Sequence, residues 1–337
     1  MAALEGEIGR TPLREVPLRR GSYLLRIRAR GRAEVRYPVL VERDGHWDGR
    51  APGDERPTPI WLPPAAEVRA GEAYVPAGWC FIGGDPATPD SLPRRRVWVD
   101  GFFVGRYPVT VAEYIEFLND LVARGREAEA LAASPKLHSS VVGAGVEPAL
   151  HRDASGLFGL GPGQPDSELA CPVVQVDWHA ATAYARWLSA RTGRAFRLPN
   201  ELEREKAARG ADGRFLPWGD HVDPTFARVI DTSEDAARRG PVTGHPSDES
   251  PYGIRGLSGN TRDWCLNVWR HGGPVMEGDR LTLDPAADED PEYRVIKGGA
   301  WTAMMMNGRA AARFGGRPDL RMQTVGLRVA RSALRRA

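Results

Sequence analysis

The most informative phrases of this 337-residue sequence are Arg294-Val-Ile-Lys-Gly-Gly-Ala-Trp301 and Gly326-Leu-Arg-Val329. Glycine lets a neighbouring backbone approach where a side chain would collide, and arginine suits charge-assisted pairing at a buried edge. The phrases therefore predict a rigid frame on either side of the less regular segment 301–323. The residues expected to act as scaffold are Gly298, Gly299, Gly326, Arg313 and Arg328.

Seven further phrases precede this frame, each built from Gly, Pro, aromatic or charged residues at turn-like spacing. In chain order they are Val75-Pro-Ala-Gly-Trp79 with Phe81-Ile-Gly-Gly84, Val99-Asp-Gly-Phe-Phe103 with Tyr107-Pro-Val-Thr110, Pro172-Val-Val174 with Val176-Asp-Trp178, Arg197-Leu-Pro199 with Glu201, Glu205 and Ala207-Ala-Arg-Gly210, Pro217-Trp-Gly-Asp220, Ser250-Pro-Tyr-Gly253, and Gly259-Asn260 with Asp263-Trp264. In this order the phrases resemble the formylglycine-generating enzyme, or sulfatase-modifying factor, family. The resemblance covers residues 72–332 and implies an α+β, C-type-lectin-like fold that is turn-rich with few helices.

The first 68 residues are expected to form a small β module with a Pro-rich linker. Apolar and polar side chains alternate in segments 22–31 and 33–43, which is the period of half-buried strands. A PEGA-like β module followed by this kind of domain resembles the C-terminal half of certain bacterial Ser/Thr kinases. The sequence contains no kinase Gly-rich loop, HRD or DFG motif, so it carries no kinase domain of its own.

Three helices are predicted inside the domain, because each begins after a capping residue and repeats apolar residues at helical spacing. Segment 134–170 has no clear periodicity and is predicted to be a long insertion loop. The predicted helices are Val111–Ala123, Trp178–Thr192 and Asn200–Arg209.

The family resemblance implies oxidative chemistry that these residues do not support. Formylglycine-generating enzymes bind copper through a cysteine pair, but the matching stretch Gly298–Arg313 contains no cysteine. The three cysteines of the chain lie in other motifs and form no CxxC pair. Thioethers also bind soft Cu(I), but the neighbours in Met304–Met306 would point to opposite sides of an extended segment. The related iron-dependent sulfoxide synthases use histidines of an added helical domain, which the short N-terminal module lacks.

Calcium is the one cofactor that the resemblance leaves open. Family members bind it near the segment that corresponds to 252–264, through backbone carbonyls and carboxylates. Asp263 keeps a carboxylate there, whereas the usual Asn position is a glycine. The alternative is that Asp263 and Asn260 only satisfy loop backbone groups. The candidate calcium ligands are Gly256, Gly259, Thr261 and Asp263.

The segment between the two frame phrases is the predicted ligand surface. Four of the six methionines fall within residues 304–322, and methionine-rich surfaces suit adaptable binding. The segment also resembles the C-terminal surface of the variable proteins of diversity-generating retroelements, which use the same fold to bind varied ligands. The predicted binding residues are Trp301, Thr302, Met304, Met305, Met306, Asn307, Phe314, Arg317, Leu320, Arg321, Met322 and Gln323.

Composition limits the remaining classes of function. The chain has 46 basic and 44 acidic residues and a net charge of +2, which argues against a purely electrostatic nucleic-acid or membrane-coating role. No apolar run could span a bilayer and no signal peptide opens the sequence, so we expect a cytoplasmic protein. A short basic tail is expected at residues 333–337.

The sequence therefore favours a non-catalytic module that binds an unidentified protein or small molecule, without nucleic acid or membrane insertion. The first alternative is an oxidoreductase of the formylglycine-generating family that acts on a protein or small molecule. The second alternative is the sensory half of a Ser/Thr kinase system.

Overall fold

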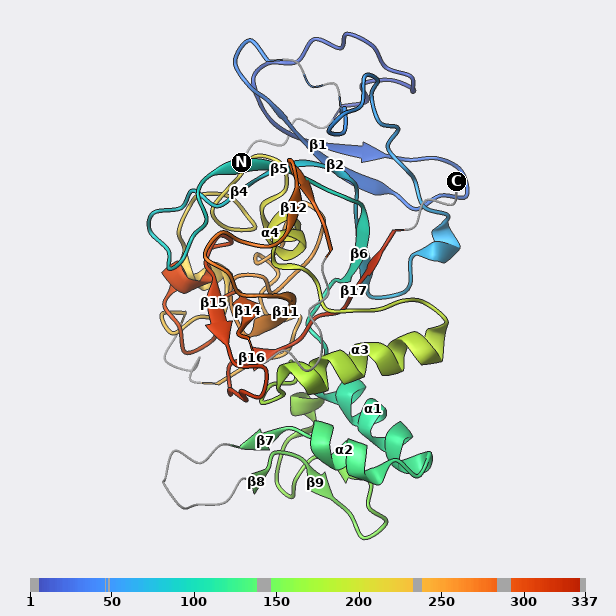
Figure 1. Cartoon of the computed structure of the whole chain (residues 1–337), viewed down its shortest axis with the longest axis vertical. Coiled ribbons are helices and arrows are strands. Elements are labelled where there is room, and N and C mark those ends of the chain that lie inside the picture. The colour runs from blue at the N-terminus through green and yellow to red at the C-terminus, as the bar shows by residue number, and fades with distance from the viewer. Residues whose placement is uncertain are drawn as a thin grey trace.

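The computed structural model describes residues 6–45, 47, 49–137, 147–232, 238–283 and 292–333. Three regions follow one another along its long axis (Figure 1): a two-stranded hairpin, a middle body of short sheets, and a group of helices at the far end. The fold is mixed α+β with many short strands, which confirms the predicted class. The predicted tail beyond residue 333 lies outside the described residues.

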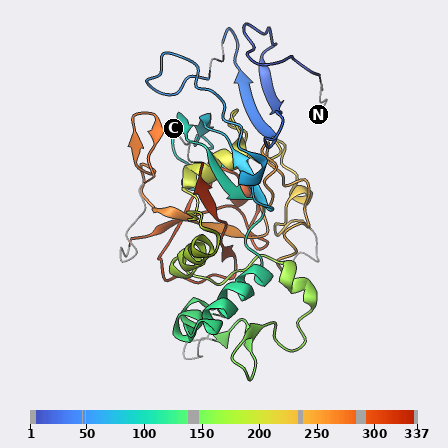
Figure 2. The same cartoon turned by 90° about the vertical axis from the view of Figure 1, so that its right-hand side faces the viewer.

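The N-terminal hairpin consists of β1 (Gly21–Ile27) and β2 (Val35–Val41), which pair antiparallel with Tyr23 opposite Val39. β2 lies within the segment predicted for it, and β1 begins one residue before its predicted segment. One face of β2 packs on the middle body, where Tyr37 and its neighbours join a cluster with Tyr74 and Phe103. Figure 2 shows the hairpin standing at one end of the molecule, with α1 to α3 at the other end.

The middle body contains three small sheets with the orders β17-β6-β3, β12-β13-β5-β4 and β15-β14-β11-β16. In the third sheet β11 pairs antiparallel with β14 and parallel with β16, so that the two frame phrases of the sequence flank one central strand. The strands are β3 (Glu72–Val75), β4 (Gly78–Ile82), β5 (Arg95–Val99), β6 (Phe102–Gly105), β11 (Arg262–Val268), β12 (Met276–Glu277), β13 (Arg280–Leu281), β14 (Arg294–Lys297), β15 (Phe314–Gly316), β16 (Val325–Gly326) and β17 (Ala330–Ser332).

The described residues form four α-helices: α1 (Val111–Ala123), α2 (Glu127–Ala133), α3 (Trp178–Thr192) and α4 (Glu201–Arg209). The predictions for α1 and α3 match the observed bounds, and α4 begins one residue later than predicted because Asn200 is its N-cap. Capping boxes begin α1 and α4, and the Asp177 side chain caps α3. None of these helices is long and apolar enough to cross a membrane.

Segment 134–170 is more ordered than the predicted loop where the structure describes it. Two short strand pairs lie in it, β7 (Lys136–Leu137) with β8 (Glu147–Pro148) and β9 (His151–Arg152) with β10 (Phe158–Gly159). Strands of two residues carry too little alternation to be recognised from sequence.

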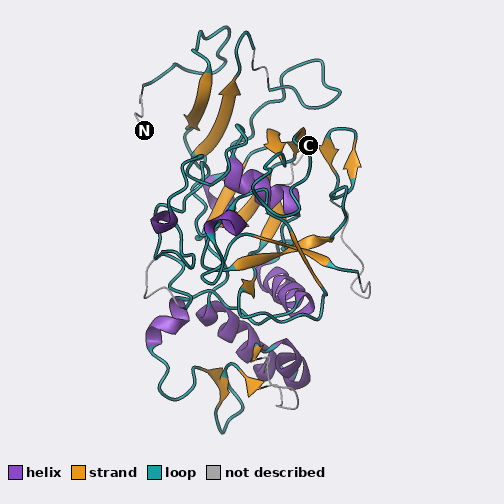
Figure 3. Cartoon of the chain, turned by 90° about the vertical axis from the view of Figure 1, so that its left-hand side faces the viewer, coloured by secondary structure: helices purple, strands orange, loops and turns teal. Residues whose placement is uncertain are grey.

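Helix α4 is a charged helix at the centre of the body (Figure 3). All nine of its residues are buried, although six carry charge. Glu205 pairs with Lys297 at 2.8 Å and with Arg209 at 2.7 Å, and Glu201 pairs with Arg313 at 2.5 Å. Burial alone would raise the pKa of Glu205, but Lys297 and Arg209 hold it below its ordinary value. These paired charges fix α4 beneath the frame phrases.

Candidate functional site

The segment that follows β14 alternates between buried and exposed side chains. Met304 and Met306 are 61% and 46% exposed, whereas Met305 between them is 5% exposed. Trp301 is also buried, at 7%. Neighbouring methionines do differ in burial, but Met305–Gly308 is a 3-10 helix and not the extended segment that the prediction assumed. The prediction that Trp301 and Met305 face a ligand is wrong, because both side chains point into the protein.

The buried members of this segment anchor it to a loop more than seventy residues earlier in the chain. Met305 packs in a cluster with Leu216, Trp218, Ala227 and Val229. The carbonyl oxygen of Ala303 accepts a 3.1 Å hydrogen bond from the backbone N–H of Ile230. This pairing places the backbone of Ile230, which sequence reasoning did not single out, beside the segment that carries the exposed methionines.

Ile230 is 55% exposed, which is unusual for an isoleucine. Its backbone N–H bonds the carbonyl oxygen of Ala303, the residue before Met304. The three exposed apolar side chains Ile230, Met304 and Met306 are called the methionine patch from here on. On the other side of the segment, the Thr88 hydroxyl donates a 3.1 Å hydrogen bond to the carbonyl oxygen of Met306. Two segments far apart in sequence thus supply the patch, and Thr88 from a third segment holds the backbone of Met306.

The residues after the patch hold it rigidly from below. Arg309 pairs with the buried carboxylate of Asp85, with its Nε 2.5 Å from Oδ2, and its guanidinium lies over the Phe215 ring at 4.2 Å. The carbonyl oxygen of Phe215 accepts a hydrogen bond from the backbone N–H of Ala310. The exposed methionines therefore project from a fixed backbone.

The frame glycines allow the close approach that the sequence predicts. A Cβ on Gly299 or on Gly308 would lie 2.1 Å from the carbonyl oxygen of Ser258, which no side chain can tolerate.

The Ser258 loop is itself held by Asp248, whose carboxylate accepts hydrogen bonds from the backbone N–H groups of residues 257–259 at 3.0–3.2 Å. Burial raises the pKa of Asp248 to about 6.

The second half of the predicted surface has a different role. Arg321 donates hydrogen bonds to the carbonyl oxygens of Ala132 and Ser134 and to the Asp177 carboxylate. Its guanidinium is therefore occupied by contacts within the protein. Phe314, Leu320 and Met322 are half-buried and pack on the cluster formed by α1 and α3. The prediction of Arg321 as a ligand contact is wrong, because its donors bind elements that are remote in sequence.

The remaining predicted residues lie on the surface without a common partner. Arg317 pairs with Asp319 at 3.0 Å in the open, and Thr302 and Gln323 are exposed while Asn307 is half-buried. Their role in binding stays a prediction.

The chain is similar to known proteins over most of its length. The sulfatase-modifying factor enzyme 1-like domain matches residues 62–333. The chain belongs to this family. It is 30% identical over 302 residues to a formylglycine-generating enzyme of Thermomonospora curvata, a match that covers 80% of this chain and 95% of the relative. It is also 28% identical to the serine/threonine-protein kinase Pkn1 of Chlamydia trachomatis, over 77% of this chain and 38% of the kinase.

Two solved structures share the fold of the family domain. PvdO from Pseudomonas aeruginosa superposes with a TM-score of 0.58 at 25% identity, over 77% of this chain and 94% of PvdO. Treponema denticola variable protein 1 superposes with a TM-score of 0.54 at 18% identity, over 77% of this chain and 94% of that protein. The second likeness shows the C-type-lectin-like fold alone.

The copper site of formylglycine-generating enzymes does not fit the residues of this family member. Cys80, Cys171 and Cys265 are all buried, and the matching stretch Gly298–Arg313 has no thiol. Burial raises the pKa of the Cys80 thiol to about 11 and raises that of Cys265 further. In the described ranges, no three His, Cys, Asp or Glu side chains gather closely enough to hold a metal ion.

The predicted calcium site is contradicted by the surroundings of Asp263. This fully buried carboxylate lies 2.9 Å from the guanidinium of Arg204 and 3.5 Å from that of Arg328. The two positive charges already compensate Asp263 and would repel a calcium ion. The alternative weighed for Asn260 is supported, because its side chain bonds both backbone groups of Gly240 at 2.8 and 2.9 Å.

Proposed function

We propose that this chain is a non-catalytic binding module of the sulfatase-modifying factor family, and that the methionine patch contacts a protein partner. The observation that carries the proposal is the contrast between a rigid base and adaptable exposed side chains. Met304 and Met306 project from a backbone fixed by Met305, Ala303 and Arg309. Rigid frames with flexible, polarizable side chains suit recognition of apolar partner surfaces.

The enzyme alternative differs from this proposal in its requirement for a redox centre. The oxygen chemistry of formylglycine-generating enzymes depends on thiolates that this chain does not place at the corresponding segment. Copper and iron analysis of the purified protein, together with an oxygen-uptake assay, separates the two functions. We expect less than one tenth of a redox metal per chain and no uptake above buffer. Stoichiometric copper or iron with oxygen uptake would overturn the non-catalytic proposal.

Binding at the patch is tested by selecting peptides from a random display library on the immobilised chain. We expect selected peptides to bind the wild type and to lose at least tenfold in affinity with Ile230→Asp or Met304→Asp. Val275→Asp is the matched control, since Val275 is also an exposed aliphatic residue but lies outside the patch. Peptides that bind all three variants equally would show that the patch is not the binding surface.

A sensory role beside a Ser/Thr kinase is the second candidate. It is favoured by the match to Pkn1, of which the family domain here corresponds to about two fifths. The same patch would then bind the stimulus or the kinase. This role predicts that a kinase gene adjoins the gene of this chain. It also predicts that the encoded kinase binds the methionine patch, which a binding assay tests directly.

A further inference from the structure

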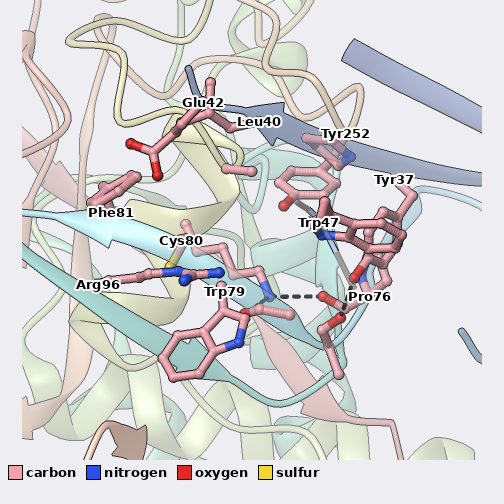
Figure 4. Close-up of a pocket in the computed structure, with 15 residues that line it drawn as sticks. Tyr37, Leu40, Glu42, Trp47, Pro76, Trp79, Cys80, Phe81, Arg96 and Tyr252 are labelled. Atoms are coloured by element: carbon pink, nitrogen blue, oxygen red, sulfur yellow. Dashed lines mark hydrogen bonds between the residues drawn. The ribbon is translucent and has the colours of Figure 1, made fainter. Parts of the chain in front are cut away.

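A pocket lies between the N-terminal hairpin and the family domain (Figure 4). The hairpin and the loop after it supply Tyr37, Glu42 and Trp47, and the domain supplies Trp79, Arg96 and Tyr252. No residue of the methionine patch lines it, so its function is independent of the proposed protein contact.

Aromatic rings form the walls of this pocket. Trp47 meets Tyr37 edge to face with ring centroids 5.5 Å apart, and Trp79 meets Trp98 in the same way at 5.7 Å. Tyr37 also belongs to the cluster that packs the hairpin on the domain, so the walls are formed before any ligand arrives. Preformed aromatic pockets with a few polar groups are typical of small-molecule sites.

A tyrosine hydroxyl opens into this pocket. Tyr252 as a whole is 5% exposed, but its hydroxyl oxygen is not among the buried polar atoms that lack a partner, and it makes no hydrogen bond to the described residues, so it meets solvent. The phenol ring is directed into the pocket in Figure 4. Burial raises the pKa of Tyr252 well above its ordinary value, so the hydroxyl keeps a proton that it can donate. A ligand that enters the pocket can replace the water that this hydroxyl would otherwise bind.

Two opposite charges face the same pocket without neutralising each other. The Arg96 guanidinium lies over the Trp79 ring at 4.7 Å, and in the part of the chain that the structure describes neither Arg96 nor Glu42 forms an ion pair. The Lys206 ammonium adds positive charge at the floor, but its three protons already go to the carbonyl oxygens of residues 76, 78 and 99. Arg96 and Glu42 are therefore the free ionic groups of the pocket.

We propose that this pocket binds a small zwitterion with the chemistry of a free α-amino acid. Its carboxylate would meet Arg96 and the Tyr252 hydroxyl, its ammonium would meet Glu42, and its side chain would contact Trp47. A plain anion would be repelled by Glu42, and a plain cation by Arg96 and Lys206. Because Glu42 comes from the hairpin and Arg96 from the domain, the ligand would bridge the two.

The proposal is tested by titrating the full chain calorimetrically with each of the twenty L-amino acids. The best binder is then compared with its amide, which lacks the carboxylate charge, and its N-acetyl derivative, which lacks the ammonium charge. We expect both derivatives to bind at least tenfold more weakly than the parent. Absence of binding by every amino acid, or equal binding of either derivative, would overturn the proposal.

Variants locate the site. Tyr252→Phe, Glu42→Gln and Arg96→Gln should each weaken binding at least tenfold while leaving the thermal unfolding midpoint unchanged. The matched controls are Glu34→Gln and Arg95→Gln, whose charges pair elsewhere with Arg28 and Asp279. Hydrogen exchange of segment 35–45 should slow when the ligand is present. Equal losses in the controls, or retained binding in the three pocket variants, would contradict the site.

Discussion

The guanidinium of Arg321 lies 2.5 Å from one carboxylate oxygen of Asp177, while the other oxygen of Asp177 caps α3 at Ala180. One aspartate thus joins the last long loop of the chain to the first turn of a helix 140 residues earlier. The same arginine reaches two carbonyl oxygens at the end of α2. This loop is therefore held in place by internal contacts and is not free to adapt to a ligand.

Arg321→Ala should reduce the free energy of unfolding by about 3 kcal/mol, because a largely buried carboxylate loses its partner. Peptide affinity at the methionine patch should stay within twofold of the wild type. Urea unfolding and peptide titration measure the two effects separately. Loss of affinity without loss of stability would instead restore Arg321 as a ligand contact.

Gly326→Ala should destabilise the fold by about 3 kcal/mol, because the added Cβ would lie 2.1 Å from the carbonyl oxygen of Val173. Gly159→Ala is the matched control, since nothing lies within 4 Å of its added Cβ and its φ is ordinary. Chemical denaturation of the two variants gives the comparison. Equal stabilities would mean that the frame does not require the close approach.

The buried Asp263 should be structural and not a calcium ligand. Asp263→Asn leaves Arg204 and Arg328 without their shared counter-charge and should cost about 3–5 kcal/mol of unfolding free energy. Addition of calcium or of EDTA should leave the melting temperature of the wild type unchanged. A calcium-dependent rise in melting temperature that Asp263→Asn abolishes would contradict this assignment.

Asp248 should make stability depend on pH in the direction opposite to that of a paired carboxylate. Its pKa is raised from 3.8 to about 6 in the folded state, so ionisation costs more when the protein is folded. The contribution of Asp248 to stability is therefore full below pH 3.8 and falls as pH rises to about 6. We compare the free energy of unfolding of the wild type with that of Asp248→Asn at two pH values. The wild type minus variant difference should be about 2 kcal/mol larger at pH 4.5 than at pH 7.5. A difference that does not vary between the two pH values would contradict the raised pKa.

Local signals are sufficient to predict three of the four described α-helices and the frame. Thr110 and Asn200 begin capping boxes that mark α1 and α4 in the sequence itself. Helix α2 was missed because it has seven residues and no side-chain cap at Arg126. The domain boundaries proposed at residues 68 and 72 stay a prediction.

The candidate site was only partly predictable, because its parts meet through long-range contacts. Met304 and Met306 are exposed on either side of Met305 because Met305 and Gly308 form the buried side of a 3-10 helix, which the sequence did not predict. Ile230 and Thr88 join them only through hydrogen bonds to the backbone of residues 303 and 306, which leave no mark on nearby sequence. The error on Arg321 has the same origin, since its partners lie more than 140 residues away.

The affinity of one library-selected peptide for wild type and for Met304→Asp, measured side by side with Val275→Asp, tests the central claim most directly. The methionine patch predicts at least a tenfold loss for Met304→Asp, no change for the control, and an unchanged melting temperature in both. Equal affinity for wild type and Met304→Asp would contradict the assignment of the patch as the binding surface.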